Sequence, residues 1–156
     1  MHSSGSLLVA SVCLVLVGCA TLGPGGQCPR ASEQGIAALF DRWNASLQTG
    51  DPHQVVANYA ARSILLPTVS NAPRLTPADK LAYFENFLKS RPSGVIDLRF
   101  VDIACNTALD AGLYTFTFGT TGQVVHARYT FTYRWEGGQW LITSHHSSAM
   151  PEAAPH

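Results

Sequence analysis

The stretch Ala127–Pro151, ARYTFTYRWEGGQWLITSHHSSAMP, decides the fold of this chain. Within Arg128–Trp135, aromatic residues alternate with polar or basic ones. Because side chains alternate across a strand, this pattern predicts a β-strand with one aromatic and one polar-basic face. Glu136–Gly138 is typical of a turn, and a second strand is expected over Gln139–Ser147. The stretch therefore predicts an antiparallel hairpin.

Two further long strands precede this hairpin. The apolar and β-branched runs predict strands over Val95–Cys105 and Ala108–Phe118, and the first hairpin strand extends back to Gln123. Short turn-forming segments separate them, as expected for strands that pair with their neighbours in sequence. The second half of the chain is therefore expected to form a four-strand antiparallel meander.

Helices dominate the first half of the chain. Ser32 is placed to cap an amphipathic helix that runs to about Thr49, and Asp51-Pro52 starts a short helix with Tyr59 among its apolar positions. A short strand is expected over Ser63–Val69, and Thr76 caps a third helix that runs to about Lys89. Since the helices precede the long strands, the fold class is α+β. We expect a cone, in which a strongly curved antiparallel sheet wraps around the N-terminal helices.

Composition narrows the possible partners. The 156 residues are enough for one domain, and 46% hydrophobic with 13% charged residues fit a folded one. Ten basic residues balance ten acidic ones, so the chain lacks the positive charge of nucleic-acid-binding proteins. Lys80 and Lys89 are the only lysines, which also argues against a polybasic membrane patch.

The N-terminus has the pattern of an export signal. Leu7–Val17 has the size of a signal-peptide core, and Leu16–Cys19 resembles the lipobox of bacterial lipoproteins, although Met1–Ser6 lacks the usual positive charge. We therefore expect a signal peptide over residues 1–18, lipidation at Cys19, a tether over 19–31, the domain over 32–152 and a tail over 153–156. The alternative is an ordinary signal peptide. Ala20 after the cysteine favours the outer membrane of an exported, envelope-anchored lipoprotein.

Export would place the remaining cysteines in an oxidising compartment. Cys13 lies in the predicted signal peptide and Cys19 would carry lipid, which leaves Cys28 and Cys105 as a possible disulfide pair. The alternative is two unrelated thiols. The four cysteines lack the spacing of a zinc site.

Several motifs together resemble a known superfamily. They are Trp43-Asn44, Thr49–Pro52, Leu65–Pro67 and the closing hairpin, and they are similar to the nuclear transport factor 2-like (SnoaL-like) proteins. Within that superfamily, Arg134–Pro151 resembles the association domain of calcium/calmodulin-dependent protein kinase II and its bacterial SgcJ/EcaC-type relatives. The resemblance implies a cone with a cavity and self-association as a homodimer or larger ring. A kinase catalytic domain is excluded, because its sequence motifs are missing and the chain is too short.

The resemblance also suggests ligand-binding residues. The kinase association domains line a pocket for anionic small molecules with arginines, which implies this role for Arg128 and Arg134. However, Ser147 stands where those relatives have another arginine. The alternative is that both arginines lie on the outer sheet face or pair with carboxylates such as Asp97 or Glu136.

Aromatic residues are the other candidates for the pocket. Trp43, Tyr59, Tyr83 and Tyr133 would suit an apolar or aromatic ligand, but the same residues can simply fill a core. His145 and His146 lie next to each other on a strand and point to opposite faces, so they cannot hold one metal ion and only one can face a cavity. No metal and no cofactor is expected.

An enzyme is the alternative function. Isomerases, dehydratases and cyclases of this superfamily use a cavity Asp or an Asp–His pair as general base, and such a base needs a raised pKa. Asp97, Asp102 and Asp110 lie on the expected strands, but each is expected to be at the surface or ion-paired, and Asp97 shares its parity with Arg99. SgcJ/EcaC relatives carry an oxidoreductase label, but this sequence contains no nucleotide or flavin motif that would support such an activity.

We therefore expect an exported, non-catalytic domain that binds an unknown small molecule in a hydrophobic cavity and self-associates through its outer sheet face. It would not bind nucleic acid and would meet the membrane only through its lipid. The alternative is a small cavity enzyme with Asp97, His145 or His146 as the candidate base. The binding and enzyme hypotheses differ in whether an ionisable group faces the cavity beside a polar partner.

Overall fold

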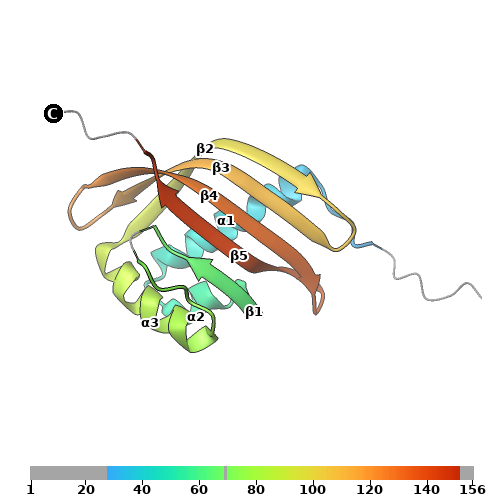
Figure 1. The fold of residues 1–156 in the computed structure, drawn as a ribbon, viewed down its shortest axis with the longest axis horizontal. Coiled ribbons are helices and arrows are strands. Elements are labelled where there is room, and N and C mark those ends of the chain that lie inside the picture. The colour runs from blue at the N-terminus through green and yellow to red at the C-terminus, as the bar shows by residue number, and fades with distance from the viewer. Residues whose placement is uncertain (1–27, 69, 152–156) are drawn as a thin grey trace, which may run out of the picture.

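The computed structural model describes residues 28–68 and 70–151 (Figure 1). Its elements are α1 (Glu33–Gln48), α2 (Pro52–Val56), β1 (Tyr59–Leu66), α3 (Pro77–Phe87), the 3-10 turn η1 (Leu88–Ser90), β2 (Pro92–Ile103), β3 (Thr107–Phe118), β4 (Val124–Glu136) and β5 (Gln139–Ala149). None of the helices in the described part of the chain has the length and hydrophobicity of a membrane-spanning segment.

The strands form one curved, open sheet in the order β1-β5-β4-β3-β2 (Figure 1). The last four strands pair antiparallel in sequence order, as the predicted meander requires. Strand β1 adds a fifth member, which pairs parallel to β5. The predicted α+β fold class is therefore confirmed, with one strand more than the meander.

The first strand begins earlier than predicted. Asn58 explains the difference: its side-chain amide donates to the carbonyls of Gln54 and Val55 at 3.0 and 3.1 Å. These bonds satisfy carbonyls at the end of α2, which stops at Val56. Tyr59, expected in that helix, is instead the first residue of β1.

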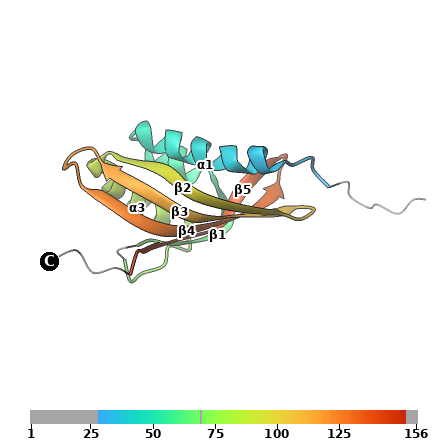
Figure 2. The ribbon, with the colours of Figure 1, turned by 90° about the horizontal axis from the view of Figure 1, so that it is seen from above.

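Helix α1 lies along one face of the sheet (Figure 2). Ser32 caps it as predicted, accepting a hydrogen bond from the Gly35 N–H at 3.1 Å. Its predicted apolar stripe is buried and forms much of the core: Ile36, Leu39, Phe40, Trp43 and Leu47. Asn44 fixes the helix to β2, because its side chain exchanges two hydrogen bonds of 2.9 Å with the Gly94 backbone.

Strand β2 contains a bulge that changes its alternation. Its register with β3 shifts between Ile96 and Leu98, which leaves Asp97 without a partner in the ladder. At the bulge, the backbone of Leu98 lies very close to Gly112 on β3. Only glycine fits there, since a Cβ at Gly112 would lie only 1.9 Å from the Leu98 carbonyl oxygen. The expected shared parity of Asp97 and Arg99 is therefore wrong: Asp97 is exposed, whereas Arg99 turns toward the core.

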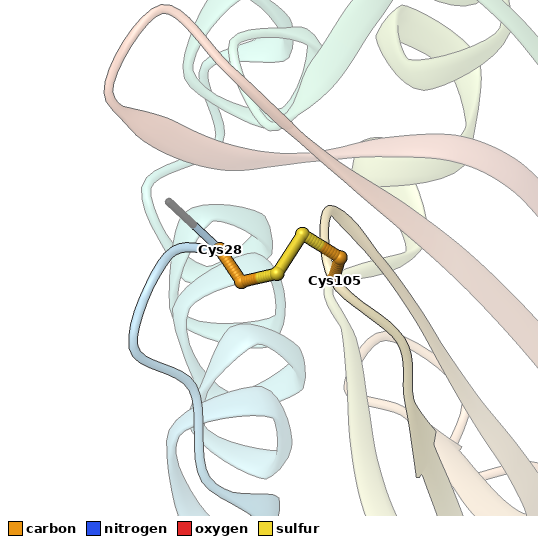
Figure 3. The surroundings of a disulfide bond; sticks show 2 residues. All are labelled: Cys28 and Cys105. Carbon is orange, nitrogen blue, oxygen red and sulfur yellow. A yellow bond between two sulfur atoms is a disulfide. The ribbon is translucent and has the colours of Figure 1, made fainter. Parts of the chain in front are cut away.

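A disulfide joins Cys28 to Cys105, with an S–S distance of 2.01 Å (Figure 3). Cys105 lies in the turn between β2 and β3, and Cys28 lies just before α1. The bond therefore ties the segment preceding α1 to the tip of the β2–β3 hairpin.

Candidate functional site

A cavity of about 210 Å³ lies between α1, α3 and the sheet. Its wall is mostly aromatic and aliphatic, with a few hydroxyl groups and one imidazole. The residues are Trp43 from α1, Leu65, Pro67 and Thr68 from the end of β1 and the loop after it, Tyr83 and Phe87 from α3, Tyr114, Phe116 and Phe118 from β3, Gln123, Val125 and Ala127 around the start of β4, and His145 and Ser147 from β5.

His145 is the imidazole in this wall. Its Nδ1 lies 2.8 Å from the Tyr59 hydroxyl, and its ring stacks on Phe131 with the centroids 4.1 Å apart. The side chain is 4% exposed. Burial, together with the neighbouring His146, lowers the pKa of His145 to about 3. The imidazole is therefore neutral near pH 7.

A bulge in β5 determines that His145 faces inward. Thr132 pairs with Ser144 and Tyr133 pairs with Ile142, so Thr143 is an extra residue between them. The Thr143 hydroxyl donates to the Thr132 carbonyl at 3.1 Å. Without the extra residue, every second side chain after Ile142 would point inward, which would bury His146 instead of His145. With it, His145 is buried and His146 is exposed on the outer face.

Three hydroxyl groups form a chain in the same wall. The Tyr114 hydroxyl donates to Ser147 Oγ, and Ser147 Oγ also shares a hydrogen bond with Thr68 Oγ1. Ser147 and Tyr114 are 8% and 3% exposed, respectively. The sequence pattern did not predict Thr68 or Tyr114 as site residues, and Ser147 drew attention only as the residue in place of an arginine. The parity of Tyr114 with Phe116 and Phe118 was the available signal.

Asp110 belongs to a different buried cluster. Its Oδ1 accepts from the Tyr129 hydroxyl at 2.7 Å and from Arg99 Nε at 3.2 Å. The carboxyl is fully buried, and burial raises its pKa against the opposing effects of Tyr129 and Arg99. Asp110 is thus an ion-paired carboxylate, one of the two outcomes expected for it, and it does not line the cavity.

The predicted pocket residues divide between the cavity and other places. Trp43 and Tyr83 line it, and Tyr59 lies behind His145 as its hydrogen-bond partner. Tyr133 is buried but lies outside the wall, on the far side of Phe131 along β4. Tyr133 faces inward as its parity predicts, but it lies too far along β4 to line the cavity.

Neither predicted arginine reaches the cavity. Arg128 pairs with Ser148 on the outer face and donates to the Ala149 carbonyl at 3.3 Å. Arg134 bonds Glu136 at 2.6 Å. Both alternate with the buried residues of β4, so the parity of the strand directs them away from the helices. The resemblance implied a pocket role for both arginines, but neither of them lines this cavity.

The remaining candidate base, Asp97, is also outside the cavity. It is exposed on β2 and accepts a hydrogen bond from Thr115 at 2.6 Å. Among the described residues, no group of His, Cys, Asp and Glu side chains is arranged to hold a metal ion. Cys19 lies outside the described residues.

Comparison with known proteins places this geometry in a family. Residues 32–151 match the calcium/calmodulin-dependent protein kinase II association domain. A crystal structure from Xanthomonas campestris, assigned to the same domain, is 49% identical, covers 80% of this chain and 91% of its own, and superposes with a TM-score of 0.75. No curated protein matches the chain at a significant level.

More distant structures share the fold. A nuclear transport factor 2-like protein of unknown function from Pseudomonas putida is 22% identical, with 79% and 96% of the two chains covered and a TM-score of 0.67. A protein from Streptomyces avermitilis, assigned as a dehydratase of the same family, is 12% identical, with 76% and 96% covered and a TM-score of 0.66. At these identities the likeness concerns the fold alone.

Proposed function

Because the chain belongs to the calcium/calmodulin-dependent protein kinase II association domain family, we propose that it is a non-catalytic domain that binds a small molecule and assembles with copies of itself. The observation that carries the binding function is the aromatic cavity of about 210 Å³. An apolar cavity of ~150 Å³ is large enough for a benzene-sized molecule. Convergent polar groups in an otherwise apolar wall are typical of ligand sites.

Filling the cavity tests the binding function. Val125→Trp would place a large ring inside it, because Val125 is a wall residue on the inner face of β4. Val124→Trp adds the same bulk on the outer face, where Val124 is 52% exposed. Mass spectrometry of small molecules released from protein purified from its own host should find a ligand with wild type and Val124→Trp, and none with Val125→Trp. Equal recovery from all three proteins would contradict the proposal.

An outer apolar face supports the assembly function. It consists of Val95, Leu98 and Phe100 on β2 with Leu109 and Leu113 on β3. The three β2 residues are 63%, 56% and 61% exposed, and Leu98 pairs directly with Leu113. Exposed apolar patches of this kind mark interaction sites. The family's description as an association domain supports a second copy of this chain as the occupant.

A charge on this face tests assembly. Leu98→Asp is expected to shift the protein toward monomer, because a carboxylate buried between copies would lack a partner. Leu75→Asp is the matched control, since Leu75 is 54% exposed but lies before α3, away from the outer apolar face. Light scattering at micromolar concentrations gives the mass. A wild-type protein that is monomeric throughout would overturn the assembly proposal.

A cavity enzyme is the second candidate, and the position of His145 beside Tyr59 favours it. However, a general base works best when its pKa is near the working pH, and a pKa of about 3 makes His145 a weak base. The buried carboxylate that could assist lies in the separate Arg99–Tyr129 cluster. Turnover of a cavity ligand that His145→Phe abolishes would establish the enzyme instead.

We also propose that the protein is exported and anchored through lipid at Cys19. The disulfide between Cys28 and Cys105 supports export, because such bonds persist in oxidising compartments. Metabolic labelling with an alkyne fatty acid in a bacterial host should label the wild-type protein in the membrane fraction. Cys19→Ser should lose the label and Cys13→Ser should keep it. Labelling of Cys19→Ser would contradict the proposal.

A further inference from the structure

We propose that the cavity selects an uncharged, ring-sized molecule that carries a hydrogen-bond-accepting oxygen, and that the hydroxyl chain of Thr68, Ser147 and Tyr114 holds this oxygen. The inference rests on the proposed binding function and names the chemical class of its ligand. It departs from the anion pocket that the arginines of related proteins would imply.

The hydroxyl chain has a donor to spare. Tyr114 bonds Ser147, and Ser147 bonds Thr68. Among the described residues, no other group is bonded to these three hydroxyls. A hydroxyl group carries one proton, so the group holds three protons and uses two of them internally. Whichever way the Ser147–Thr68 bond runs, one O–H, on Ser147 or on Thr68, remains free to donate to a ligand oxygen.

The position of the chain makes this donor selective. Ser147 and Tyr114 are buried, Thr68 is half-buried, and all three line the cavity. The surrounding wall includes Phe87, Phe116 and Phe118, among other apolar side chains. A ligand that fills the cavity without an acceptor displaces water from the free O–H and leaves that donor unsatisfied.

The wall also excludes charge. None of the described residues that line it is charged, and His145 is neutral there. Neither Lys80 nor Arg74 lines the wall: Lys80 donates to the carbonyls of Ser63 and Leu75, at 2.9 and 3.1 Å, and Arg74 Nη2 donates to Ser70 at 3.0 Å. A carboxylate in this cavity would lose its hydration without gaining a counter-ion, which is strongly unfavourable.

Three probes of nearly identical shape separate these effects. Acetophenone offers a carbonyl oxygen, cumene has a methyl group in place of that oxygen, and benzoate has a carboxylate in place of the acetyl group. Calorimetric titration of the full protein with each probe gives the ranking. Acetophenone should bind about fivefold more tightly than cumene, the worth of one hydrogen bond. It should bind about a hundredfold more tightly than benzoate, because burial of the carboxylate is uncompensated.

Nearly isosteric substitutions test the role of the hydroxyls. The triple variant Thr68→Val, Ser147→Ala, Tyr114→Phe keeps the shape of the wall and removes all three oxygens. It should retain cumene binding and lose the preference for acetophenone. Ser148→Ala is the matched control, because Ser148 lies opposite Arg128 on the outer face and should leave the ranking unchanged.

Each remaining outcome has a distinct meaning. Cumene binding as tightly as acetophenone to the wild-type protein, or benzoate binding best, would overturn the inference while leaving a ligand-binding cavity. Failure of all three probes to bind at their solubility limits would overturn the proposed binding function itself. If the triple variant does not fold, the wild-type ranking alone decides.

Discussion

The two ends of strand β3 lie in different kinds of interior. Near its start, Asp110 is buried with Arg99 and Tyr129 in a cluster of charged and hydrogen-bonded groups, close to the disulfide at Cys105. Near its end, Phe116 and Phe118 line a cavity without a charged group among the described residues. Figure 1 shows this separation: the β2–β3 turn lies at one end of the sheet, and α3 covers the other.

The difference indicates a division of roles. At the hairpin end, a buried ion pair and a covalent bond join neighbouring segments, so changes there should act on stability. At the cavity end, polar groups are neutral and keep unused hydrogen-bonding capacity, so changes there should act on ligand choice and pH response.

The largest expected effect is loss of the disulfide. It closes a loop across 77 positions, and loop-closure entropy gives a stabilisation of about 4 kcal/mol. Cys28→Ser combined with Cys105→Ser should lower the free energy of unfolding by about this amount in urea denaturation. Asn106→Ser, in the same turn, should have little effect. Equal stability of oxidised and reduced wild-type protein would show that the hairpin end does not depend on this bond.

Removal of the Asp110 carboxylate should come next. Asp110→Ala leaves Arg99 without its counter-ion and the Tyr129 hydroxyl without its acceptor, which should cost about 3 kcal/mol because Arg99 is partly exposed. Asp97→Ala removes an exposed carboxylate from the neighbouring strand and should change stability by less than about 0.5 kcal/mol. Similar losses from both substitutions would remove the distinction between a buried cluster and a surface bond.

The smallest of the three effects concerns pH at the cavity end. The pKa of His145 is lowered to about 3, so the unfolded chain takes up a proton below about pH 6.5 that the folded protein excludes. Stability is therefore complete above that pH and falls as the pH decreases toward 3, with a loss of about 2 kcal/mol by pH 5.

Unfolding in urea at pH 7.5 and pH 5 measures this loss. His145→Phe should remove about 2 kcal/mol of the pH dependence, whereas His146→Gln, on the exposed face, removes only the smaller cause of the lowered pKa of His145 and should change the pH dependence much less. An identical pH dependence in His145→Phe and wild type would show that the imidazole is protonated in the folded protein.

Much of the fold was predictable because its signals are local. Alternation over Arg128–Trp135 predicted a two-faced strand, and the spacing of apolar residues predicted α1. The boundary between α2 and β1 was missed, because it depends on hydrogen bonds made by the Asn58 side chain. Such bonds override the apolar pattern that placed Tyr59 in a helix.

The site was less predictable because it depends on register. Adjacent histidines require that one faces inward, but the bulge at Thr143 decides which one, and its sequence gives no sign of an extra residue. The hydroxyl chain also joins Thr68, Tyr114 and Ser147 from three separate segments. Pattern along the chain cannot reveal contacts across 79 and 33 positions.

The disulfide also fixes how the protein would respond to mechanical load. A pull applied before Cys28 passes through the sulfur atoms to Cys105 and then into β3. Helices α1–α3 and strands β1 and β2 lie inside the closed ring and cannot lengthen. Stretching the oxidised protein between its ends should therefore release only the chain after Cys105, whereas the reduced protein should extend along its whole length.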